Sequence, residues 1–213
     1  MNVFNSTQIA NTYDIYYQTE LGKTVDNIEK EIILGLLNDI PKERMLELGC
    51  GTGHWTEFFL NNNFEVTGID ISESMLNIAK LKNLNCELTI GNSENIPFKN
   101  SSFNMVSSIT MLEFVENIDI VVQEIFRVLK TGGYLLIGCL NSESIIGINK
   151  DKDKTFKNAN FLNINDIKMK FSQFQLLQIQ SGVYLNDEYQ IMDYSENYNS
   201  IAPVFIAALF QKQ

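Results

Sequence analysis

The feature that most constrains this chain is a glycine-rich segment, Gly49 to Gly53, between an apolar run and an amphipathic stretch. The run from Arg44 to Leu48 predicts a buried strand, and the stretch after the glycines predicts a helix through Leu60. Glycines at alternate positions let the backbone turn sharply and approach a ligand, while the helix directs free N–H groups to the same place. This order predicts a ligand at the carboxyl end of the first strand of an α/β sheet.

An acidic residue follows the next predicted strand. That strand runs from Phe64 to Ile69 and ends at Asp70, seventeen residues beyond Gly53. A carboxylate there can accept hydrogen bonds from both hydroxyl groups of a ribose. Nicotinamide and flavin folds favour G-x-G-x-x-G, whose third glycine would fall on His54 in this chain. The pattern therefore favours an adenosine-containing cofactor that lacks a pyrophosphate.

Strand and helix patterns alternate five times, which predicts a doubly wound, mainly parallel sheet. Two late strands have no clear helix between them, so we expect that they can pair antiparallel. Before the first strand, an aromatic-rich helix is predicted over Gln8 to Gln18, and Thr24 is predicted to cap a helix that runs to Asn38. Gly132 is predicted to supply a left-handed cap after the helix from Ile118 to Leu129. The remaining predicted strands are Glu87–Ile90, Phe103–Ser108, Tyr134–Leu140, Phe174–Gln180 and Pro203–Phe210.

Length and composition narrow the class of protein. The 213 residues predict one domain, with residues 1–40 as a helical lead-in and 141–162 as a variable loop over the acceptor side. A net charge of -10 argues against a nucleic-acid substrate, because phosphate binding needs clustered Lys and Arg. No apolar stretch is long enough to span a membrane, and the N-terminus lacks a signal-peptide pattern. Three cysteines without metal-ligand spacing are expected to be buried and reduced, so we expect a cytoplasmic protein without a metal.

Several sequence blocks, in order, resemble class I S-adenosylmethionine-dependent methyltransferases of the small-molecule type that includes the quinone-biosynthesis enzymes. The resemblance implies a single Rossmann-like domain whose sheet has seven strands, the last of them antiparallel and inserted beside the sixth. It also implies S-adenosylmethionine as the donor and S-adenosylhomocysteine as the product. The oligomeric state does not follow from it. The matching blocks are LELGCGTGH at 46–54, GIDIS at 68–72, GNSENIPF at 91–98, SFNMV at 102–106 and RVLKTGG at 127–133.

The resemblance also implies a set of cofactor-binding residues. The glycine loop would line the methionine portion of the donor, and Asp70 would hold the ribose hydroxyls. Met75 is equally well explained as a core residue, and Asn92 stands where the family usually has Asp. An amide oxygen can still accept from the adenine amino group. The implied residues are Glu47 near the amino group; Gly49, Cys50, Gly51 and Gly53 in the loop; Asp70; Ile71 and Met75 beside adenine; Asn92 and Ser93 at its edge; and Thr110 near the sulfonium.

Methyl transfer by in-line displacement depends mainly on alignment, so a recognisable catalytic triad is not required. The candidates for acid–base chemistry are His54, Tyr13, Tyr17 and Glu113, although packing explains His54 and the tyrosines as well. The segment after the fourth strand lacks the paired prolines typical of enzymes that methylate amino groups of DNA. We therefore expect a small organic acceptor. Two alternatives stay open: a non-catalytic protein that binds S-adenosylmethionine, and an NAD-dependent oxidoreductase.

Overall fold

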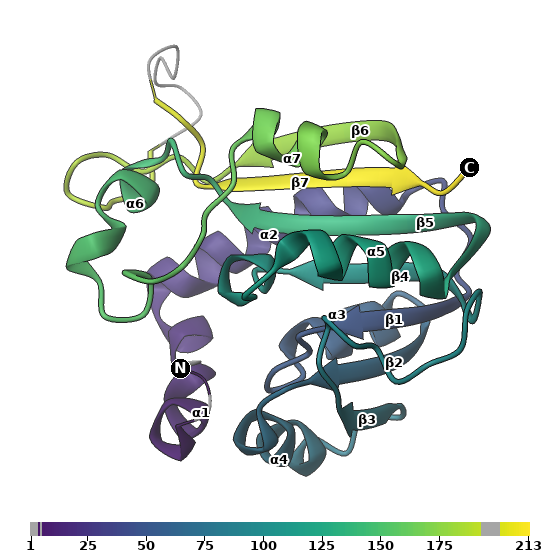
Figure 1. Cartoon of the computed structure of the whole chain (residues 1–213). Coiled ribbons are helices and arrows are strands. Elements are labelled where there is room, and N and C mark those ends of the chain that lie inside the picture. Colours follow the sequence, from purple (N-terminus) through teal and green to yellow (C-terminus); the bar gives the residue numbers. More distant parts are fainter. Residues whose placement is uncertain (1–3, 5, 193–200) are drawn as a thin grey trace.

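The computed structural model describes residues 4, 6–192 and 201–213, and it is built around one seven-stranded sheet (Figure 1). The strand order is β3-β2-β1-β4-β5-β7-β6. All neighbouring strands are parallel except β7, which is antiparallel to both β5 and β6. The predicted mainly parallel sheet with an antiparallel last strand is thus confirmed. The strands are β1 Arg44–Leu48, β2 Glu65–Asp70, β3 Glu87–Ile90, β4 Phe103–Ile109, β5 Leu129–Leu140, β6 Gln175–Gly182 and β7 Phe205–Gln211.

Apolar side chains cover both faces of the sheet. Successive residues of a strand point to opposite faces, and Met45 and Leu46 of β1 accordingly belong to two separate core clusters. The first cluster includes residues of α2 and α3, and the second includes residues of α5 and α7. The α-helices are α1 Thr7–Tyr13, α2 Glu20–Leu37, α3 His54–Asn61, α4 Glu73–Leu81, α5 Ile118–Val128, α6 Ile145–Ile148 and α7 Ile164–Lys170. Short 3-10 turns lie at Tyr16–Gln18, Leu112–Phe114 and Lys150–Lys152.

The N-terminal helices begin and end elsewhere than the sequence predicts. The lead-in is not one helix, because α1 ends at Tyr13 and a separate 3-10 turn follows at Tyr16–Gln18. The cap of α2 is Thr19 rather than Thr24: the Thr19 hydroxyl accepts from the Gly22 amide at 2.9 Å. Thr24 lies inside the helix and donates its hydroxyl to the Glu20 carbonyl.

The end of α5 also differs from the prediction. The helix ends at Val128, and Leu129 already has an extended backbone as the first residue of β5. Amides of Ser101 and Ser102 donate to the last helical carbonyls, at Arg127 and Val128, so a glycine cap is not needed. Gly132 does have a left-handed backbone (φ 77°), but it lies within β5.

Candidate active site

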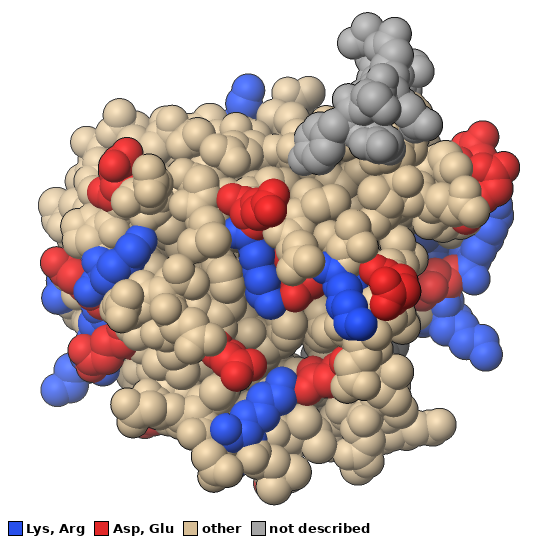
Figure 2. All heavy atoms as spheres, turned by 180° about the vertical axis from the view of Figure 1, so that it is seen from behind, with Lys and Arg blue, Asp and Glu red and all other residues tan. Residues whose placement is uncertain are grey.

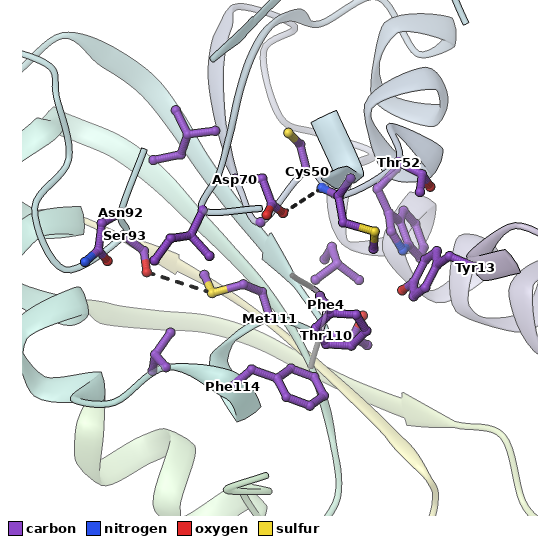
Figure 3. A pocket seen from close by; sticks show the side chains of 18 of the residues that line it. Phe4, Tyr13, Cys50, Thr52, Asp70, Asn92, Ser93, Thr110, Met111 and Phe114 are labelled. Carbon is purple, nitrogen blue, oxygen red and sulfur yellow. Dashed lines mark hydrogen bonds between the residues drawn. The ribbon is translucent and has the colours of Figure 1, made fainter. Parts of the chain in front are cut away.

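A cavity of about 500 Å³ opens where the carboxyl ends of β1, β2 and β4 meet, the place where α/β sheets bind ligands (Figure 3). Nine of the eleven implied cofactor residues line it: Gly49, Cys50, Gly51, Asp70, Ile71, Met75, Asn92, Ser93 and Thr110. Glu47 and Gly53 do not. Residues that are far apart in the sequence thus surround one space.

The glycine loop is shaped by its own conformation and by close packing. Gly49 and Gly51 both have left-handed backbones, with φ of 71° and 52°. A Cβ at Gly49 would lie 2.3 Å from Cγ of Met111, so any side chain there would collide. A Cβ at Gly51 would meet nothing nearer than Met75 Cε at 3.7 Å and the Gly49 carbonyl oxygen at 4.0 Å, so the loop is less crowded at Gly51. The loop therefore presents bare backbone to a ligand.

Asp70 connects the two loops that border the cavity. Its Oδ2 accepts from the Gly51 amide and its Oδ1 from the Ser72 amide, both at 2.8 Å. Burial raises the pKa of this carboxyl, while the amides of Ser72, Gly51 and Ile71 oppose that shift. Each carboxylate oxygen keeps a further lone pair for a ligand hydroxyl. Asp70 is thus positioned both to fix the loops and to bind a diol.

Glu47 lies beneath the loop rather than in the cavity. Its side chain is buried, and its Oε2 accepts from the Thr56 hydroxyl at 2.5 Å. Burial raises the pKa of this carboxyl to about 8, so it loses its charge more readily than an exposed glutamate. This geometry gives Glu47 no direct contact with the space that a donor would occupy.

The part of the cavity formed by the residues after β2 and β3 has an apolar wall and a polar edge. Ile71 is half exposed although it is a large aliphatic residue, and Met75 is buried opposite the glycine loop. The Asn92 side-chain oxygen accepts from the Glu94 amide at 2.9 Å, which orders this turn. The Ser93 hydroxyl lies 4.0 Å from the sulfur of Met111 (Figure 3). Ile71 thus presents an exposed apolar surface to the cavity.

Thr110, directly after β4, has a left-handed backbone with φ of 48°. This conformation is costly for a β-branched residue and is concentrated at functional sites. The Thr110 amide donates to the Gly138 carbonyl at 2.7 Å, which holds the strained residue against the neighbouring strand. With this backbone conformation, Thr110 lies in the cavity lining, between the glycine loop and the aromatic residues.

The four acid–base candidates are not equally placed. His54, Tyr13 and Tyr17 line the cavity, whereas Glu113 does not. His54 stacks on Tyr17, with ring centroids 3.6 Å apart, and its Nε2 lies 2.7 Å from Oδ1 of Asp26. Glu113 is fully buried and accepts from the Leu140 amide at 2.6 Å, so it supports the start of the segment after β5. Burial raises the pKa of Glu113 to about 7.

Several lining residues were missed by the sequence analysis. They come from the N-terminus, from the turn after β4 and from the segment between β5 and α7. No motif marks them, because their positions depend on how these segments fold over the sheet. Trp55 is buried and also lines the cavity. The missed residues of these three segments are Phe4, Met111, Phe114, Val115, Glu116, Thr155, Asn158 and Asn160, and Glu94 after β3 was missed as well.

The N-terminal segment is fastened to the cofactor side by polar contacts. Asp14 accepts from the Thr52 hydroxyl in the glycine loop at 2.6 Å and pairs with Lys82 at 2.7 Å. The Ser72 hydroxyl donates to the carbonyl of Phe4 at 2.7 Å. These contacts place α1 and its flanking residues over the mouth of the cavity.

The described residues include no helix that is long and apolar enough to cross a membrane. Within the same residues, no group of three or more His, Cys, Asp or Glu side chains is arranged to hold a metal ion. The three thiols are free: Cys50 and Cys139 are buried as expected, but Cys86 is only half-buried. The expectation that all three cysteines are buried was therefore wrong for Cys86, which follows the turn between α4 and β3.

The sheet order and the cavity at its switch point define a Rossmann-like α/β protein of the methyltransferase type. A solved S-adenosylmethionine-dependent methyltransferase from Thermotoga maritima shares this fold, with a TM-score of 0.75, 24% identity and coverage of 97% of this chain and 98% of that one. Residues 46–137 match the family model described as a methyltransferase domain. The chain belongs to the class I S-adenosylmethionine-dependent methyltransferases.

The sequence relatives match different shares of this chain. The uncharacterised protein MJ1123 of Methanocaldococcus jannaschii is 36% identical over 171 residues, which cover 78% of this chain and 77% of that protein. A demethylmenaquinone methyltransferase from Lactococcus lactis is 40% identical over 106 residues, or 46% of this chain and 42% of the relative. The chain thus matches less than half the length of that enzyme, and the match does not carry its acceptor over to this protein.

Proposed function

We propose that the protein transfers the methyl group of S-adenosylmethionine to a small organic acceptor by in-line displacement. The observation that carries this proposal is the position of Asp70, which closes the glycine loop at one end of a cavity whose other end is lined by aromatic side chains. When bound, S-adenosylmethionine supplies a methyl group on a positively charged sulfur. In-line displacement would bring the acceptor to that methyl group from the side opposite the sulfur.

The residues present fit this donor. Asp70 offers acceptors to the ribose hydroxyls, and Ile71 offers an exposed apolar surface to adenine. Bare backbone at Gly49 and Gly51 would admit the methionine portion, and the strained Thr110 would lie next to the reacting methyl. Cys50, Met75, Asn92 and Ser93 complete the donor side. Glu47 and Gly53 do not line the cavity, and they support the glycine loop from outside it.

No catalytic base follows from the geometry. His54 is already paired with Asp26 and stacked on Tyr17, which favours a role in positioning the loop. Tyr13 and Tyr17 shape the acceptor side, and burial raises the pKa of both phenols, so neither readily loses its proton to act as a phenolate base. The proposed catalysis therefore depends on alignment and on exclusion of water.

We propose a small molecule rather than a nucleic acid as the acceptor, and a cytoplasmic protein consisting of a single methyltransferase domain. On the face shown in Figure 2, basic and acidic side chains lie close together rather than in a basic tract. Free thiols are usual in a reducing compartment. In the segment 141–162, Thr155, Asn158 and Asn160 line the cavity, which supports its proposed place over the acceptor.

Calorimetry and thermal unfolding test the donor assignment. S-adenosylmethionine at 100 times its dissociation constant is expected to stabilise the fold by about 2.7 kcal/mol, whereas NAD at the same concentration is expected to leave the melting temperature unchanged. Release of S-adenosylhomocysteine with a panel of small acceptors then tests turnover. Tight donor binding without turnover on any acceptor would favour the non-catalytic alternative, and stabilisation by NAD would favour an oxidoreductase.

A further inference from the structure

The cavity lining has an uneven charge. The described lining residues include three carboxylates, Asp70, Glu94 and Glu116, but no lysine or arginine. His54, the one lining residue able to become cationic, is held by Asp26. The negative field that results favours positive charge in the cavity and disfavours an anion.

The three carboxylates have different amounts of free hydrogen-bonding capacity. Both oxygens of Asp70 accept from backbone amides. Oε1 of Glu94 accepts from the amides of Glu116 and Asn117 at 2.9 and 2.8 Å, so it holds the turn before α5. Glu116 is exposed at the mouth of the cavity, and among the described residues no cation pairs with it. Its carboxylate has no hydrogen-bond or ion-pair partner among the described residues, whereas Glu94 and Asp70 already accept from backbone amides.

Aromatic rings form the wall of the acceptor side. Phe4 contacts Phe114 and Tyr13 edge to face, with ring centroids 4.9 and 5.9 Å apart, and Tyr13 contacts Tyr17 at 6.0 Å. Figure 3 shows Phe4, Tyr13 and Phe114 on the side of the cavity away from Asn92 and Ser93. Ring faces attract cations, most strongly where water is excluded. This wall and the Glu116 carboxylate therefore favour the same kind of ligand.

We propose that the acceptor is a neutral nitrogen nucleophile, an amine or a nitrogen heterocycle, that becomes a cation when it is methylated. This inference rests on the proposed function. In the transfer, the nitrogen lone pair forms the new N–C bond while the S–C bond breaks and its electron pair stays on sulfur. The positive charge moves from sulfur to nitrogen, and no base is needed for that step. A carboxylate or phosphate acceptor would instead enter a negative cavity without a cationic partner.

The test compares two probes with the same ring and opposite charge, benzyltrimethylammonium and benzoate. Each is titrated by calorimetry into protein saturated with S-adenosylhomocysteine. We expect the cation to bind at least tenfold more tightly than benzoate. Equal or tighter binding of benzoate, or absence of binding by the cation, would overturn the proposal. Failure of S-adenosylhomocysteine itself to bind would overturn the proposed function and this inference with it.

The variant Glu116→Gln separates acceptor binding from donor binding. We expect it to weaken binding of the cation about two- to fivefold, the scale of a partly exposed charge pair, and to leave the affinity for S-adenosylhomocysteine within twofold. Glu31→Gln removes an exposed carboxylate outside the cavity and is the matched control. An equal loss of affinity for S-adenosylhomocysteine would show that Glu116 serves the donor, and the assignment would be wrong.

Discussion

At the scale of single residues, the Asp70 carboxylate orders the glycine loop, and we propose that the same carboxylate binds the donor. We expect Asp70→Ala to weaken S-adenosylmethionine binding by about 1.5–3 kcal/mol, the scale of hydrogen bonds to a charged group. Isothermal calorimetry measures this loss. Glu73→Ala removes a neighbouring exposed carboxylate and is expected to leave the affinity unchanged. Unchanged affinity in Asp70→Ala would remove Asp70 from the site.

At Thr110 we expect one substitution to raise stability and to lower activity. Glycine adopts a φ of 48° without strain, so Thr110→Gly is expected to increase the free energy of unfolding by about 1 kcal/mol. The same change frees the segment that we propose lies beside the reacting methyl, and it is expected to lower kcat. Urea denaturation and initial rates measure the two effects. Thr110→Ala, which keeps the strain, is the control; a loss of stability in Thr110→Gly would show that side-chain contacts outweigh the strain.

At the scale of elements, α1 and the turn after it act as a cover that Asp14 fastens to the glycine loop and to α4. Asp14→Asn removes the charge that pairs with Lys82 and weakens the contact with Thr52. We expect dissociation of S-adenosylmethionine to become about three- to tenfold faster, with less than about 1 kcal/mol change in global stability. Stopped-flow fluorescence measures the rate.

The control for this cover is Glu20→Gln, which breaks an exposed pair with Lys23 at the start of α2. Its dissociation rate is expected to match the wild type. If Asp14→Asn also leaves the rate unchanged, the contacts of Asp14 do not limit release of the donor. Hydrogen exchange of the amides of α1 would then be expected to match the wild type as well.

At the scale of the whole molecule, three buried carboxyls make stability depend on pH. Burial raises the pKa of Glu29 and Glu47 to about 8 and that of Glu113 to about 7. The folded state therefore binds more protons than the unfolded state between about pH 4.5 and pH 8. The free energy of unfolding is expected to fall across this window, by on the order of a few kcal/mol.

Urea denaturation at pH 5.5 and pH 8.5 measures that difference. Glu47→Gln keeps a hydrogen-bond partner for Thr56 and removes one titrating group, so it is expected to make the dependence shallower. Stability that rises between the two values would contradict the shifts. Below this window the trend reverses, because hydrogen bonds from His54 and Lys30 lower the pKa of Asp26 although burial opposes them.

Local sequence features predicted much of the fold. The strands β1 and β3 have the predicted bounds, and the alternation of patterns indicated the mainly parallel sheet. These features depend on neighbouring residues and on periodicity, which the sequence displays directly. The helix boundaries around Thr19 and Leu129 were mispredicted, because equivalent capping residues stood nearby and amides distant in sequence satisfied the helix end.

The glycine loop, the acid at position 70 and the class of donor were determined by the sequence, because they belong to one continuous strand–loop–helix–strand segment. Only the tertiary structure decided which candidates share the cavity. Tyr13 and Tyr17 of the N-terminal segment line it, whereas Glu47 and Glu113 do not. It also assembled the aromatic wall and the charge of the lining from segments far apart in the chain. Such contacts depend on how helices and loops pack over the sheet, and a local sequence pattern does not predict that packing.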